Sequence, residues 1–130
     1  MLTSLALAVM LSAPRAPAAD SFSARVLRGK LVEAGFGGQA YQKQMWQQIN
    51  DPVTELLKAC IASNAPADKS PFTVVADLSP DGKPERIEAR PATPVARCFA
   101  NGFGKIALPP PPKLPDSTAY PIEIDVSIVP

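Results

Sequence analysis

Hydrophobic and polar residues alternate in two segments of the second half of the chain. The first segment is Phe72 to Leu78, and the second is Tyr120 to Val129. A period of two places successive side chains on opposite faces of a β-strand, so each segment is predicted to be a strand with one buried face. In the second segment the regularly spaced apolar residues are Tyr120, Ile122, Ile124, Val126 and Ile128.

A turn signal follows the first of these strands. In Ser79-Pro80-Asp81-Gly82, proline presets one backbone angle, aspartate bonds locally and glycine accepts the left-handed conformation. Lys83 to Arg90 is therefore predicted to return as the second strand of a hairpin. A two-stranded hairpin is marginal by itself, so it must pack on other elements.

Two segments show the 3.6-residue spacing of helices. Asp51-Pro52 is typical of a helix start, with Asp51 as the cap, and Asn64 and Pro66 are predicted to end this helix. Thr93-Pro94 repeats the same start, and the helix it begins should stop at Gly102 and Gly104. The apolar stripes are Val53, Leu56, Leu57, Cys60 and Ile61 in the first helix, and Val95, Cys98, Phe99 and Phe103 in the second.

The other segments are less regular. Residues 24–32 are compatible with a short strand or an extended arm, and residues 35–38 form a glycine-rich joint. The glutamine-rich segment 39–50 has apolar residues at helical spacing, which we interpret as packing positions and not as a cofactor site. Leu108 to Pro115 predicts a polyproline helix. We favour a rigid connector for it over a recognition ligand for an aromatic groove.

The first residues have the composition of a secretory leader. Leu5 to Leu11 is apolar but far shorter than the roughly 20 residues that span a bilayer, and Ala16-Pro17-Ala18 offers a small-x-small cleavage site. We therefore expect a signal peptide at 1–18 and a periplasmic protein. The alternative is that an uncleaved leader holds the protein at the inner membrane.

Charge narrows the classes of partner. The chain has 13 basic and 12 acidic residues and no histidine, and removal of residues 1–18 takes away Arg15. Without a basic stripe, nucleic-acid binding is not expected. The sequence also shows no evident basic amphipathic helix, so neither membrane-surface binding nor stable membrane insertion after leader cleavage is expected.

Two cysteines in an exported chain predict one structural disulfide, Cys60–Cys98. The alternative is a redox-active pair, but such pairs usually have the close Cys-x-x-Cys spacing. Without histidine, and with both thiols bridged, we expect no enzymatic activity, no cofactor and no metal. The predicted fold class is α+β: a three-stranded antiparallel sheet with two helices on one face, in the order αββαβ, with one disulfide.

The order of these elements resembles the TonB C-terminal-like domains, especially the branch with a cysteine in each helix. The residues that carry this similarity are Leu56 to Cys60, Val74 to Lys83, Val95 to Phe99, Leu108 to Pro111 and the final strand. The similarity covers about 52–129, so we divide the chain into a leader (1–18), an arm with the glutamine-rich helix (19–50) and a TonB C-terminal-like domain (51–130).

The resemblance implies a periplasmic module that binds other proteins. In energy transducers of this kind, a peptide from an outer-membrane receptor adds to the sheet near the last strand. We therefore predict a non-enzymatic binding module for an envelope protein or peptide segment. Its candidate edge strand carries Tyr120, Ile122, Ile124, Val126 and Ile128. The alternative is a secreted inhibitor or an accessory subunit of an envelope complex, and a homodimer through the same edge stays open.

Overall fold

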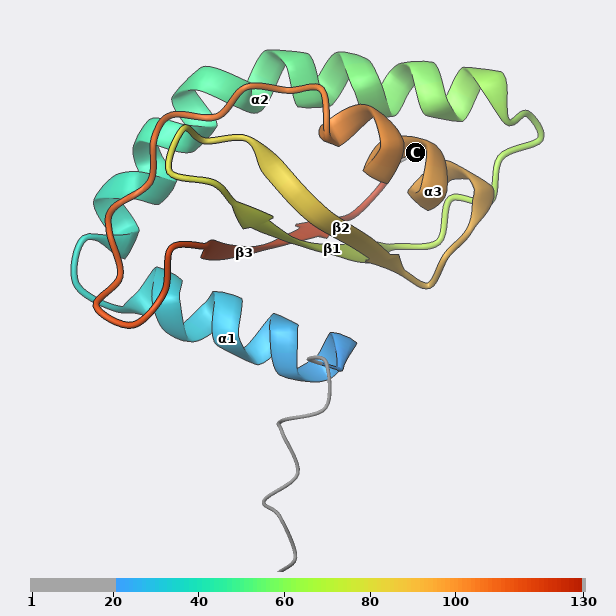
Figure 1. Ribbon diagram of the computed structural model, residues 1–130. Helices are drawn as coiled ribbons and strands as arrows, with labels where there is room; N and C mark the ends of the chain where they lie inside the picture. Colours follow the sequence, from blue (N-terminus) through green and yellow to red (C-terminus); the bar gives the residue numbers. More distant parts are fainter. Residues whose placement is uncertain (1–20, 130) are drawn as a thin grey trace, which may run out of the picture.

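The sheet lies between two helical layers of different size (Figure 1). The computed structural model describes residues 21–129, so the predicted signal peptide lies outside the described residues. The strands form one antiparallel sheet in the order β2-β1-β3, with α2 and α3 on one face and α1 on the other. The elements are α1 (Phe22–Ala34), α2 (Gly38–Ser63), β1 (Phe72–Leu78), β2 (Pro84–Arg90), α3 (Pro94–Phe103) and β3 (Tyr120–Val126).

The predicted α+β class with one disulfide is confirmed, and α1 is an addition to it. β1 has the predicted bounds, β2 begins one residue later than predicted, and β3 ends at Val126 instead of Val129. The Gly82 amide donates to the Ser79 carbonyl at 2.9 Å, and Gly82 has φ +86°, as the turn signal required. Among residues 21–129, no helix has the length and apolar character needed to cross a bilayer.

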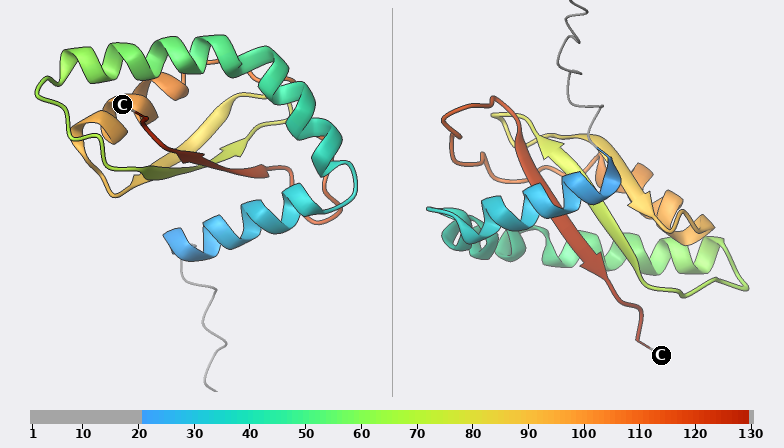
Figure 2. Two further views of the ribbon diagram at one scale, coloured as in Figure 1. Left: turned by 180° about the vertical axis from the view of Figure 1, so that it is seen from behind. Right: turned by 90° about the horizontal axis from the view of Figure 1, so that it is seen from below.

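The prediction that a helix begins at Asp51-Pro52 was wrong. α2 begins at Gly38 and continues through Pro52, which costs about 3 kcal/mol in a helix interior. The glutamine-rich segment buries Tyr41, Met45 and Ile49, which lie in the same helix as Cys60. The free energy gained by burial along this one helix outweighs the cost of the proline. The helix bends in its first half (Figure 2), as proline-containing helices do.

The prediction of a strand or arm at 24–32 was also wrong, because this segment forms the helix α1. Ser21 caps it, and its hydroxyl accepts a hydrogen bond from the Ala24 amide at 3.1 Å. Gly35 ends α1, so the glycine-rich joint between α1 and α2 is where the sequence placed it. The sequence did not indicate this helix because the residues that it buries most deeply, Arg25 and Gly29, are not apolar side chains. The apolar periodicity along the segment is therefore weak.

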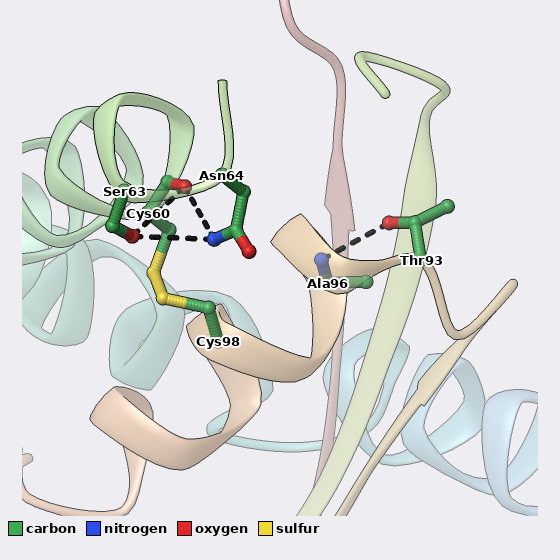
Figure 3. Close-up of a disulfide and its surroundings, with 6 residues drawn as sticks. All are labelled: Cys60, Ser63, Asn64, Thr93, Ala96 and Cys98. Carbon is green, nitrogen blue, oxygen red and sulfur yellow. Dashed lines mark hydrogen bonds between the residues drawn. A yellow bond between two sulfur atoms is a disulfide. The ribbon is translucent and has the colours of Figure 1, made fainter. Parts of the chain in front are cut away.

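The predicted disulfide is present and joins α2 to α3 (Figure 3). The Cα atoms of Cys60 and Cys98 are 5.7 Å apart, and the structure has no free cysteine in residues 21–129. α3 has the predicted Thr93 cap, whose hydroxyl accepts from the Ala96 amide at 3.1 Å. Near the end of α2, the Asn64 side-chain amide donates to the Cys60 carbonyl at 2.8 Å. The start of α3 and the end of α2 are therefore each held by a local hydrogen bond.

The apolar core lies between the sheet and the α2–α3 layer. Phe99 is fully buried at its centre, with its ring 5.6 Å from Phe72 and 5.9 Å from Phe103 between centroids. The strand residues that face this layer are Phe72, Val74, Ala76, Leu78, Tyr120, Ile122, Ile124 and Val126. The bridge lies at the border of this core, since Cys60 is buried and Cys98 is partly exposed.

Removal of the disulfide tests its contribution to stability. The bridge closes a loop with a sequence separation of 38 residues, so C60A/C98A should lower the free energy of unfolding by roughly 4 kcal/mol. Urea unfolding of the variant and of the oxidised wild type measures the difference, and reduced wild type is the matched control. Equal midpoints for the three samples would show that the bridge does not stabilise the fold.

Candidate partner-binding edge

β3 is an edge strand of the sheet. It pairs with β1 in an unbroken register from Phe72↔Val126 to Leu78↔Tyr120, and no other described strand lies on its outer side. An edge strand presents unpaired backbone N–H and C=O groups, which can accept one more strand. An open edge at β3 is what the predicted addition of a peptide to the last strand requires.

The predicted edge residues lie together, but most of their side chains serve the core. Tyr120, Ile122, Ile124 and Val126 are each at least nine-tenths buried, and Ile128 lies beyond the end of β3 and is half-buried. A partner at this edge would therefore meet the backbone of β3 and not these side chains. These buried side chains are therefore not exposed for selective contact with a partner.

β2 forms the opposite edge and is less suited to strand addition. Its register with β1 shifts between Val75 and Asp77, and Arg86 has a left-handed φ of +49°. Exposed charges along β2, such as Glu85 and Arg90, also oppose pairing with another strand. Bulges and charges are the usual protection of natural sheet edges. The two edges thus differ, and β3 is the regular one.

An apolar groove lies where the chain enters β3. Its volume is about 540 Å³. The proline segment forms one wall and is held against the protein: the Tyr41 hydroxyl donates to the Pro109 carbonyl at 2.8 Å, and the Gln48 amide donates to the Ala107 carbonyl at 2.9 Å. This anchoring agrees with a rigid connector. The groove is lined by Pro80, Pro110, Pro111, Pro112, Lys113, Leu114, Ser117, Thr118, Ala119 and Tyr120.

The other face of the sheet carries a cluster of charges under α1. Arg25 is 7 % exposed, and its Nη2 donates to the Arg86 carbonyl at 2.6 Å. Its guanidinium also lies 3.8 Å from Asp77 and 3.6 Å from Glu88. A buried charge is tolerated only where partners compensate it, so these contacts locate the first turn of α1 on the sheet.

A second cluster lies one turn further along α1. The Lys30 ammonium is 3.4 Å from Glu123 and 3.6 Å from Asp125, and the Thr73 hydroxyl donates to Asp125 at 2.8 Å. Glu123 is 8 % exposed, and its Oε1 is buried without a hydrogen-bond partner in residues 21–129. Burial, reinforced by the neighbouring Asp125, raises the pKa of Glu123 to about 7, although Lys30 opposes this shift.

Gly29 allows α1 to approach β3 closely. A Cβ atom at this position would lie 2.8 Å from the Cβ of Glu123 and 3.2 Å from its backbone nitrogen. α1 crosses β3 at an angle (Figure 2), so it contacts the middle of the strand and does not run along its whole length. The sequence pattern did not predict this second helical layer. The Ser21 cap and the spacing of Arg25, Gly29 and Val32 were the signals for it.

Other site chemistry is sparse in the described part of the chain. Between residues 21 and 129, no group of three His, Cys, Asp or Glu side chains is arranged to hold a metal ion. Comparisons with protein families, curated proteins and solved structures find no match to this chain. The similarity to TonB C-terminal-like domains therefore stays a resemblance.

The dependence of stability on pH tests the Glu123 environment. Its pKa is about 7 in the folded chain against an ordinary 4.5, so the folded chain keeps a proton that the unfolded chain releases between these values. The free energy of unfolding should therefore fall as pH rises through this window. Glu123→Gln should remove about 1 to 2 kcal/mol of that fall, after allowance for solvent screening.

Urea unfolding at about pH 4.5, 6 and 8 measures this difference between wild type and E123Q. Asp116→Asn, which changes an exposed carboxylate, is the matched control and should follow the wild type. A wild-type to E123Q difference that stays constant over this range would contradict the assignment.

Substitution of Gly29 tests the close approach of α1 to β3. Gly29→Ala should lower the free energy of unfolding by about 1 to 2 kcal/mol, because the added methyl group forces α1 away from Glu123. Gly35→Ala, where the nearest atoms to a new Cβ are 3.4 Å away, is the control and should have little effect. Thermal unfolding and amide exchange within α1 measure both. Equal stability of the two variants would mean that α1 is not held this closely.

Proposed function

We propose that this protein is a non-enzymatic periplasmic binding module of TonB-like fold, which docks an extended segment of another envelope protein along the outer edge of β3. The observation that carries the proposal is the regular β3 edge beside an apolar groove. The leader-like sequence at 1–18 and the disulfide support an oxidising compartment outside the cytoplasm.

Strand addition divides binding between backbone and side chains. The backbone groups of β3 supply affinity that does not depend on partner sequence, while pockets beside the edge select alternate side chains. The groove at Thr118 and Ala119 lies directly before β3 begins at Tyr120. A segment paired with β3 can therefore extend one end into the groove and place an apolar side chain there. The preferred partner is an extended peptide with an apolar anchor near one end.

Selection of peptides from a random display library on the oxidised protein provides a ligand for testing. We expect that binding of a selected peptide slows amide exchange in β3 and leaves β2 unchanged, because only β3 gains backbone partners. Thr118→Trp fills the groove and should weaken affinity by about tenfold or more. Asp116→Trp, an exposed position outside the groove lining, should change affinity by less than about twofold.

Two results would contradict the proposal. Slower exchange in β2 or in the α2–α3 layer, with β3 unchanged, would place the peptide elsewhere. Equal affinity of T118W and D116W would exclude the groove as the specificity pocket and would leave strand addition to be judged by the exchange data alone.

A further inference from the structure

α1 exposes apolar side chains on the face opposite to its contact with the sheet. Arg25 and Gly29 are buried against the sheet. Leu27 follows Arg25 by two residues, and Leu31 follows Gly29 by two, which is about half a helical turn. The side chains of Leu27 and Leu31 are 59 % and 64 % exposed, so neither takes part in the apolar core. Phe36, in the turn after α1, is fully exposed.

Cations flank this apolar face. Arg28 and Lys30 lie on either side of the Leu27–Leu31 line, and both are exposed. Lys30 bends toward Glu123 and Asp125 but its side chain remains 53 % exposed. Glu33 is the single acidic residue in α1. An outward apolar strip bordered by cations can lie in a membrane interface, with the cationic groups among the lipid headgroups. The sequence-based expectation of no membrane-surface binding stays a prediction, which the vesicle experiment below tests directly.

From this placement we infer that α1 docks the protein on the surface of a bilayer containing anionic phospholipids, with Leu27, Leu31 and Phe36 inserted at the headgroup boundary and Arg28 near the phosphates. Two features favour a membrane over a second copy of this chain. An antiparallel pair of α1 helices would bring Arg28 and Lys30 close to the same cations of its mate. A 13-residue helix is also only about 20 Å long, so such a pair would bury less than the roughly 1,000 Å² of a stable interface.

The chain outside the described residues agrees with this location. The apolar run Leu5 to Leu11 precedes α1 by only ten residues. In an uncleaved chain, a leader inserted in a bilayer would keep α1 within reach of the same membrane surface. The surface is also separate from the β3 edge, because the apolar strip points away from the sheet. The inference therefore does not rest on the proposed function, and either one can fail alone.

Co-sedimentation with unilamellar vesicles tests the inference. The chain from residue 19 onward contains every described element and excludes the leader, which would bind lipid by itself. We expect it to bind vesicles rich in phosphatidylglycerol, less so as salt is raised, and to bind pure phosphatidylcholine weakly. L27S/L31S should reduce partitioning by about tenfold or more. Arg28→Gln should reduce it by about fivefold, the effect of one charge near an anionic surface.

Matched controls distinguish this face from general stickiness. Val129→Ser removes an 84 % exposed apolar side chain in the C-terminal tail, and Arg97→Gln removes an exposed cation of α3 on the other side of the sheet. Both should bind vesicles like the wild type, and circular dichroism should show that every variant is folded. Equal binding of L27S/L31S and V129S would overturn the inference. So would sedimentation of the wild type as a dimer that L27S/L31S converts to a monomer, because a second copy would then cover the face.

Discussion

The pairing of β1 with strands on both of its sides is the interaction on which the rest of the structure depends. Because β1 is central, its backbone groups pair with both neighbours, and its side chains alternate between two covered faces. One set, including Val74 and Leu78, faces α2 and α3, while Thr73 and Asp77 face the side of α1. β2 and β3 become edges for the same reason. The position of the candidate binding edge thus follows from the position of β1.

The two faces of the sheet are held by different forces. On one face, aromatic and aliphatic side chains make a dry core, and the disulfide fixes the two helices above it. On the other face, α1 is held largely by ion pairs, hydrogen bonds and the close approach at Gly29, with Val75 buried beneath it. Ionic contacts contribute less than apolar burial of the same extent and respond to pH and salt. α1 should therefore be the less stable layer of the fold.

The position of α1 on the polar face of the sheet affects two surfaces of the molecule. It covers the middle of β3 and thereby limits how a partner strand can approach the candidate edge. Its buried face is centred on Arg25 and Gly29, while Leu27 and Leu31 lie in solvent, unlike the apolar residues of an ordinary surface helix. The proposed binding edge on β3 and the proposed membrane-docking face of α1 therefore use different residues.

The sequence by itself determined the local elements whose signals are short-range: the Asp-Gly turn, the Thr93 cap, the alternation of β1 and β3, and the disulfide partners. These depend on backbone preferences and on the period of apolar residues, which are written into neighbouring positions. Tertiary structure alone decided the continuity of α2 through Pro52, since the core contacts of Tyr41, Met45 and Ile49 outweigh the local cost of proline. It also decided the second helical layer and the place of β3 at the edge, because Arg25, Gly29 and Lys30 find their partners only on strands far along the chain.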